Sequence, residues 1–287
     1  MTLYHYCDTR TFSEIIRNKS VWLSSLKLSN DSEEGRVVRN ALLDMVSSDG
    51  ISQIIKDRLD NSIQFFLDRM DGLGFCLSEE GDLLSQWRGY AEDGKGLSIG
   101  FNKEYLNALS ERPADANAEM AFSLKKVIYD PKLHIQKITP IYRYLKKSID
   151  EGALSDAPRP SLLSPMNEDL ALRQKAHKEK QSEIGFPLLV LSMDMYDLKN
   201  PAFIEEKEWR MISVLFKFGD SIECSFRPSG NKIIPYKEVK FTDLGMPIID
   251  EVILGPKHMT PPDVISMLLN SHGFKDVKVR KSSATYR

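Results

Sequence analysis

The chain has few cysteines and no long apolar run, and each absence excludes a class of protein. Its three cysteines are an odd, widely spaced set among 287 residues, which argues against a disulfide framework and favours a reducing compartment. The longest apolar run, FPLLVLSM at 186–193, is too short to span a bilayer, and the first residues lack the basic and apolar parts of a signal peptide. We therefore expect a cytoplasmic protein that makes no use of a membrane.

An excess of positive charge is also absent. The formal net charge is -2, so no overall basic field exists to attract nucleic acid or an anionic membrane. A local basic patch would still allow a nucleic-acid substrate. The charged segment 166–183 is best interpreted as the solvated face of a helix rather than as a binding surface.

Strand and helix patterns alternate along the chain. Stretches rich in β-branched and aromatic residues predict strands at 2–7, 21–25, 71–78, 96–101, 122–130, 208–216, 221–226, 231–236, 252–255 and 277–280. Helical spacing of apolar residues predicts helices at 11–18, 36–70, 103–109, 131–149, 166–183 and 261–272. Residues 83–90 fit a short helix or a turn, and residues 186–196 fit a buried strand or a buried helix.

No repeat, low-complexity tract or linker divides the sequence. We therefore predict one α+β domain over residues 1–287, with helical insertions at about 33–70 and 131–183.

The common nucleotide and metal motifs do not fit. The glycines of DGKGLSIGF enter a predicted strand instead of opening a helix, so they indicate a turn rather than a dinucleotide site. No P-loop is present. His5 and Cys7 share one face of a strand, but the other one or two ligands that zinc requires are missing, and no metal site is predicted.

The segment FIEEKEWRM carries the densest group of charges in a predicted strand. In a strand register Glu206, Glu208 and Arg210 would share one face. Such a face is either an exposed edge with a weak ion pair or the polar floor of a cleft. The residues alone leave both interpretations open.

Seven stretches together resemble a known bacterial family. In chain order they are LYHYC, VWLSS with NDSEE, GFCLSEEGDLLSQWRGY, GKGLSIGF, FIEEKEWRM, VILGP and SSATYR. Their order and spacing are similar, along nearly the whole chain, to those of the uncharacterised family called domain of unknown function 2971. That label implies no activity.

The order of a few short motifs also resembles the ADP-ribosyltransferase fold. A strand with a histidine, a helix and a second short strand match LYHYC, FSEIIRNK and VWLSS, and GFCLS and SQWRGY match the aromatic segment and turn that follow. The resemblance implies a split, mixed or antiparallel β core and NAD as the substrate. Tyr6 departs from the pattern, because histidine-class transferases have a small residue there, and this puts the approach of the cofactor in doubt.

The same resemblance implies the catalytic roles. Glu208, preceded by Glu206, would stabilise the positive charge that develops on the ribose when the nicotinamide bond breaks. His5 would orient the cofactor. Glu208 and His5 should then face each other across one sugar-sized hollow, which is the central spatial prediction.

Further residues would bind NAD. Aromatic rings, hydroxyls and guanidinium groups suit the nicotinamide ring, its amide and the pyrophosphate. The candidates are His5, Ser78 or Ser85, Trp87 or Tyr90, and Arg88 or Arg210. The alternative is that Trp87, Tyr90 and His5 are ordinary core residues.

Three functions follow as hypotheses. The first is an NAD-dependent ADP-ribosyltransferase or NAD glycohydrolase in a bacterial defence or toxin system, with an unidentified protein or nucleic-acid acceptor. The second is a non-catalytic module of the same fold that binds a nucleotide or a partner. The third is a metal-dependent nuclease that uses Asp31, Glu34 and Glu208.

Overall fold

The fold is built on one mixed sheet. The computed structural model describes residues 1–28, 36–112, 122–160, 168–217 and 224–286. The strands of the sheet are β1 (Thr2–Cys7), β2 (Ser20–Ser25), β3 (Met70–Ser78), β4 (Leu97–Asn102), β5 (Ser123–Lys126), β6 (Glu208–Phe216), β7 (Ser225–Ser229), β8 (Lys232–Lys240), β9 (Ile249–Leu254) and β10 (Lys278–Lys281). Their order is β10-β9-β4-β1-β3-β2-β8-β7, with β6 pairing β3 and β5 pairing β6.

The sheet divides at its central strand, β3. One edge of β3 pairs with β6 over its whole length. The other edge is shared, because β1 pairs near its end (Tyr4 opposite Ser78) and β2 pairs near its middle (Ser24 opposite Gly74). The described pairs are antiparallel except for β9 with β10. The chain is therefore an α+β protein. Strands β1 and β2 pair with the same edge of β3 and diverge from each other along it.

Helices cover both faces of this sheet. They are α1 (Thr9–Asn18), α2 (Arg36–Ser48), α3 (Gln53–Arg69), α4 (Leu84–Tyr90), α5 (Lys103–Ser110), α6 (Pro131–Asp150), α7 (Glu168–Glu183), α8 (Gly185–Asp194) and α9 (Pro262–Ser271). Apolar residues of α1, α5 and α9 join one core with the strands. Residues of α2, α3, α6 and α8 form a second core.

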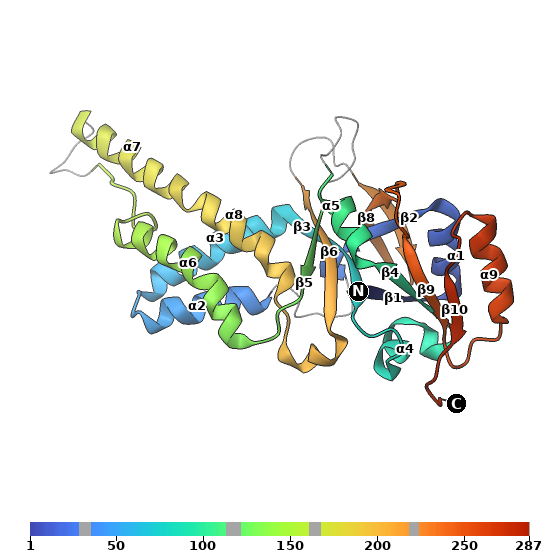
Figure 1. Cartoon of the computed structure of the whole chain (residues 1–287). Coiled ribbons are helices and arrows are strands. Elements are labelled where there is room, and N and C mark those ends of the chain that lie inside the picture. The colour runs from blue at the N-terminus through green and yellow to red at the C-terminus, as the bar shows by residue number, and fades with distance from the viewer. Residues whose placement is uncertain (29–35, 113–121, 161–167, 218–223, 287) are drawn as a thin grey trace.

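The second core reaches the sheet through a glycine. A Cβ atom at Gly72 would lie 2.5 Å from ring carbons of Tyr196, so only glycine lets that ring pack on β3. Figure 1 shows α2, α3, α6, α7 and α8 together as an arm beside the sheet, while α1 and α9 lie at its other end. The arm corresponds to the two predicted insertions, extended by α8.

Most predicted elements are observed, but the extents of two differ. The segment 36–70 is two helices, α2 and α3, because Gly50 interrupts it with a φ of 68°. Residues 186–196, for which strand and helix were both open, are helical and form most of α8 and the start of a 3₁₀ turn, Met195–Asp197. Only Ser123–Lys126 of the expected strand 122–130 is a strand. In the described segments no helix is long and apolar enough to cross a membrane.

Candidate functional site

Two carboxylates and two cations meet where β6 begins. Lys199 Nζ lies 2.7 Å from Glu206 Oε2 and 2.9 Å from Glu208 Oε2. The Arg210 guanidinium donates two hydrogen bonds to Glu208, with Nε 2.7 Å from Oε1 and Nη2 2.9 Å from Oε2. All four side chains are buried. We call these four residues the ion quartet.

Neutral groups complete the quartet. The Tyr90 hydroxyl donates to Glu206 Oε1 over 2.9 Å, and Ser78 Oγ donates to the Glu206 carbonyl over 2.7 Å. The backbone N–H of Glu208 donates to the Tyr129 hydroxyl. Every carboxylate oxygen of Glu206 and Glu208 therefore has a donor, which is the condition under which buried charge is tolerated.

The charges of the quartet sum to zero, and its pKa shifts follow from the pairing. Burial opposes the ionisation of Glu208, but Arg210 and then Lys199 outweigh it and hold the pKa of Glu208 at about 2. Burial likewise opposes the charge of Lys199, yet Glu208 and Glu206 raise its pKa well above the usual range. Burial, and then the Glu206 carboxylate, raise the pKa of Tyr90. Glu208 is thus an ionised carboxylate with both oxygens already engaged.

His5 and Glu208 do not face each other. Tyr4, Ser78 and Glu208 are directly opposed across three strands and share one face of the sheet. His5 follows Tyr4, so it leaves β1 on the other face. There its ring stacks on Phe75 at 4.0 Å. The predicted hollow between His5 and Glu208 is therefore wrong.

The His5 ring has its own structural role. Its Nδ1 lies 2.8 Å from the carbonyl oxygen of Cys76, so this nitrogen donates to that oxygen. Burial lowers the pKa of His5 to about 4, although the bond to Cys76 opposes the shift. A neutral imidazole thus ties β1 to β3 next to the point where β1 and β2 part.

Other predicted ligands lie away from the quartet. Trp87 is fully buried and packs edge-on against Tyr6, so its ring offers no face on which a ligand could stack. Arg88 is exposed, with its guanidinium 5.8 Å from the ring of Tyr286 in the C-terminal segment. Ser85 has a buried hydroxyl without a hydrogen-bond partner among the described residues.

The structure therefore brings together five of the predicted site residues. They are Ser78, Tyr90, Glu206, Glu208 and Arg210. It does not bring His5, Trp87 or Arg88 to them.

Sequence reasoning missed Lys199, a member of the ion quartet, and the role of Tyr129 beside it. Glu206 ends a 3₁₀ helix, Pro201–Glu206, and is not part of the strand in which it was expected. Its side chain reaches Glu208 through Lys199. Nothing in the string DLKNP marks Lys199 as a buried cation, and Tyr129 was expected only as a strand residue. Their roles depend on the pairing of Ile128 with Leu198, which no local pattern predicts.

An opening to the solvent lies beside the quartet, on the same face of the sheet. Every residue of β3 is buried except Cys76, which is exposed. Cys76 lies opposite Arg210, two residues from Ser78, and therefore shares the face of Glu208. The residues before it on this face, Gly72 and Gly74, are buried beneath the side chains of Tyr196 and Leu26. Solvent therefore reaches this face of β3 at Cys76, between the stretch covered by Tyr196 and Leu26 and the buried Ser78.

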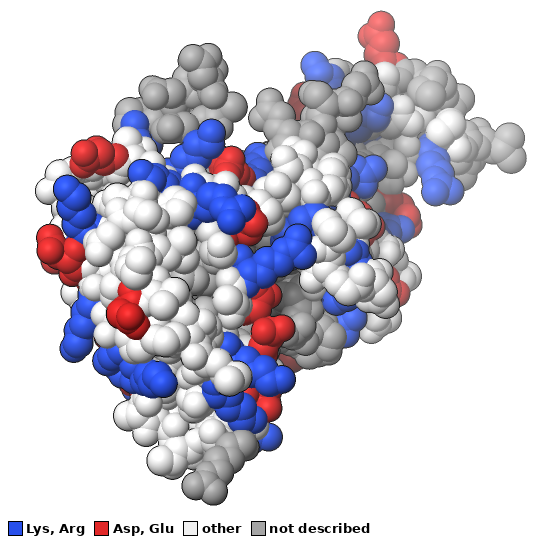
Figure 2. All heavy atoms as spheres, turned by 90° about the vertical axis from the view of Figure 1, so that its right-hand side faces the viewer, with Lys and Arg blue, Asp and Glu red and all other residues white. Residues whose placement is uncertain are grey.

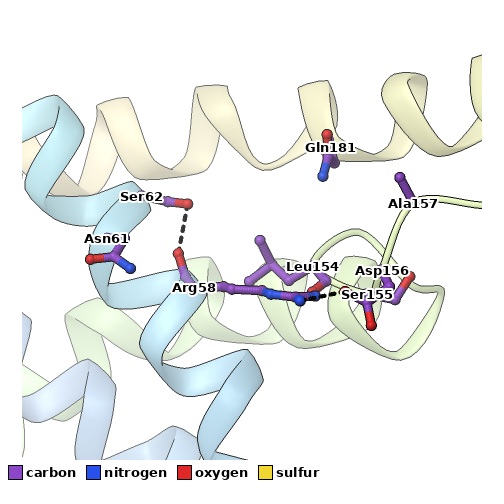
Figure 3. A pocket seen from close by; sticks show the side chains of 8 residues that line it. All are labelled: Arg58, Asn61, Ser62, Leu154, Ser155, Asp156, Ala157 and Gln181. Carbon is purple, nitrogen blue, oxygen red and sulfur yellow. Dashed lines mark hydrogen bonds and ion pairs between the residues drawn. The ribbon is translucent and has the colours of Figure 1, made fainter.

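A separate pocket of about 360 Å³ lies in the arm (Figure 3). It is lined by Arg58, Asn61, Ser62, Leu154, Ser155, Asp156, Ala157 and Gln181. The cation in this lining is engaged, because Arg58 donates to the Leu154 carbonyl over 2.7 Å and to Asp156 over 2.5 Å. These bonds join α3 to the segment after α6, which gives the pocket a structural explanation.

The nuclease hypothesis has no assembled metal site in the described segments. Asp31 and Glu34 lie outside the described residues, and Glu208 belongs to the quartet. Within the segments that can be described, no three His, Cys, Asp or Glu side chains gather so that they could hold a metal ion. Figure 2 shows basic and acidic side chains intermingled on the face near α9.

Comparison with known proteins gives a match to one family model but no function. Residues 86–211 match the model of a family described as "Protein of unknown function (DUF2971)". The predicted resemblance is thereby confirmed over these residues, which run from α4 into β6 and contain the whole ion quartet. No curated protein and no solved structure matches the chain. The likeness to the ADP-ribosyltransferase fold stays a prediction.

Proposed function

We propose that the chain is a non-catalytic binding module that holds a nucleotide over Cys76 without cleaving it. The observation that carries the proposal is the state of Glu208. A carboxylate that stabilises a developing oxocarbenium ion needs an oxygen free to approach the sugar. Both oxygens of Glu208 are held by Arg210 and Lys199 in a buried, neutral quartet.

The position of His5 supports the same conclusion. In the transferase hypothesis the imidazole orients the cofactor next to the acid. Here the imidazole lies on the other face, against Phe75, and its Nδ1 is bound to the Cys76 carbonyl. The two groups that would cleave NAD are therefore separated by the sheet.

Access to the sheet supports a binding role. The exposed Cys76 interrupts an otherwise buried central strand, and the ring of Tyr90, which is 43% exposed, lies beyond the quartet on the same face. Ligand sites commonly combine a concave opening with a few polar groups and aromatic rings. The nucleotide class follows from the resemblance of the motif order to the ADP-ribosyltransferases.

Thiol labelling tests the proposal at the opening itself. Cys7 is buried and Cys224 is half-buried, so a Cys224→Ser variant leaves Cys76 as the accessible thiol. We expect saturating ADP to slow the reaction of Cys76 with a maleimide severalfold. Cys76→Leu should abolish the thermal stabilisation by ADP, because the larger side chain fills the opening. The matched change Cys224→Leu should leave that stabilisation intact. Unchanged labelling in ADP would contradict the proposal.

A further inference from the structure

An aromatic pair lies next to the opening over Cys76. The rings of Trp22 on β2 and Tyr236 on β8 stack with centroids 4.3 Å apart and planes inclined by 26°. Ser24 lies opposite both Gly74 and Tyr236, so this face of β2 continues the face of β3 that carries Cys76. Trp22 and Cys76 each lie two residues beyond the Ser24–Gly74 pair, on the side where the strands part. The aromatic pair therefore borders the opening.

A guanidinium group accompanies the two rings. Arg227, on the edge strand β7, reaches across β8 to Ser24, with its Nε and Nη2 atoms 3.4 and 3.3 Å from Ser24 Oγ. These contacts are longer than the 2.7–2.9 Å typical of charge-assisted bonds. The group thus lies at Ser24, the residue opposite Tyr236, and is held loosely by a neutral hydroxyl.

The rings and the guanidinium are not buried. Trp22, Ser24, Tyr236 and Arg227 all keep partial exposure, whereas Val21, Leu23 and Val239 on the other face are buried in the core with α1 and α9. A cross-strand aromatic pair stabilises a sheet without any ligand. Its position beside an opening and a weakly held guanidinium is what a purely structural pair does not require.

The charge of this part of the sheet suits an anion. On the face of the aromatic pair, residues 225–240 carry the cations Arg227, Lys232 and Lys240 and one acid, Glu238, while Lys237 lies opposite Leu23 on the other face. Glu238 lies opposite Trp22, and its carboxylate is engaged by the Ser20 hydroxyl, which donates to it over 2.7 Å. Flat rings together with a planar fork of donors are the groups that bind a base and its phosphate.

We infer that Trp22 and Tyr236 form a stacking platform for a nucleobase whose phosphate is bound by Arg227. The inference rests on the proposed function for its ligand class and adds the residues that recognise the ligand. A free nucleotide and one nucleotide of a single-stranded nucleic acid both present a base and a phosphate. The experiment below distinguishes these two ligands.

The test compares ADP with a single-stranded deoxythymidine octamer, by calorimetry and by fluorescence anisotropy. Tyr236→Leu should weaken binding of whichever ligand binds by about tenfold or more, the loss expected for one stacked ring. Tyr236→Phe should bind like the wild type, because the ring is kept. Arg227→Gln should weaken binding by a similar factor. The matched controls are Phe226→Leu, an exposed aromatic residue of β7 on the other face, and Arg17→Gln on α1.

The result also identifies the ligand's source. Binding of ADP with no tighter binding of the octamer assigns the site to a free nucleotide. Tighter binding of the octamer, with an affinity that falls steeply with salt, assigns it to a single strand. If Tyr236→Leu does not fold, quenching of Trp22 fluorescence by the ligand and the Arg227 variant decide. No binding of either ligand, or equal binding by the variants and the wild type, overturns the inference.

Failure here differs from failure of the proposed function. If ADP protects Cys76 equally in the wild type and in Tyr236→Leu, the opening binds the nucleotide but the aromatic platform does not. If binding requires Tyr236 and Arg227 while Cys76 stays unprotected, the platform is the site and the opening over Cys76 is not.

Discussion

Lys199 Nζ lies 2.9 Å from Glu208 Oε2, and each side chain is only 6% exposed. Lys199 also binds Glu206, so one ammonium group holds two carboxylates together at the start of β6. The pairing joins the 3₁₀ segment before β6 to the sheet. It also sets the chemistry of the site, because it keeps Glu208 ionised and helps to hold its carboxylate oxygens in hydrogen bonds.

Removing the shared cation should destabilise the fold. Lys199→Met leaves Glu206 and Glu208 with one cation between them, and breaking a buried pair costs roughly 3–5 kcal/mol. The double change Lys199→Met with Glu206→Gln restores neutrality, so we expect it to recover part of that loss in urea unfolding. Lys207→Met is the matched control, since Lys207 pairs with Glu80 in solvent and should change stability by less than about 1 kcal/mol. Equal effects at Lys199 and Lys207 would contradict this account.

The C-terminal segment should depend on Asp82. This carboxylate accepts hydrogen bonds from Trp87 Nε1 over 2.8 Å and from the N–H and hydroxyl of Ser283 over 2.7 and 2.8 Å, besides one from Ser282. Asp82→Ala leaves these donors without their acceptor and should lower the free energy of unfolding by about 2–3 kcal/mol. It should also speed release of the C-terminal residues by carboxypeptidase. Asp169→Ala, which removes an exposed helical ion pair, should do neither.

Two glycines should respond oppositely to alanine. Gly72→Ala forces a Cβ atom against the Tyr196 ring, which separates the arm from β3, and should lower the melting temperature. Gly89 lies inside α4, where an added Cβ atom would have no described atom within 4 Å, so Gly89→Ala should leave the melting temperature unchanged or raise it. A lower melting temperature for Gly89→Ala, with none for Gly72→Ala, would contradict the close packing of Tyr196 on β3.

His5 should make the fold sensitive to mild acid. The unfolded chain binds a proton at His5 near pH 6.5, whereas the folded protein does so only near pH 4. Between these values the unfolded state holds more protons, so stability should fall as the pH is lowered from 6.5 to 4 and then level off for this group. His5→Gln should flatten the stability–pH curve in that window. An identical slope in the variant would contradict the assigned neutral imidazole.

The sequence predicted the helices and strands better than the contacts between them. Strands such as β1 and β6 are marked by their local composition and alternation. Helix α1 likewise begins at a local signal, because the Asp8 carboxylate accepts a 2.6 Å hydrogen bond from the Thr11 N–H. Glu206, Glu208 and Arg210 do lie together, but not as one strand face: a buried lysine joins Glu206 to Glu208, and Arg210 binds Glu208 directly.

The face of His5 is a matter of register. One position along β1 decides whether a side chain points toward Glu208 or away from it, and that position is set by the pairing of Tyr4 with Ser78. Trp22, Tyr236 and Arg227 are likewise far apart in the chain and meet only through the pairing of β2, β8 and β7. Short-range sequence patterns do not predict such contacts.

The fate of NAD on the purified protein tests the central claim most directly. Nicotinamide is measured over hours at a NAD concentration that stabilises the protein against heat. We predict stabilisation with no nicotinamide above the protein-free rate, because Glu208 is held by Lys199 and Arg210. Release of nicotinamide by the wild type that disappears in Glu208→Gln would contradict the account and establish Glu208 as a catalytic residue.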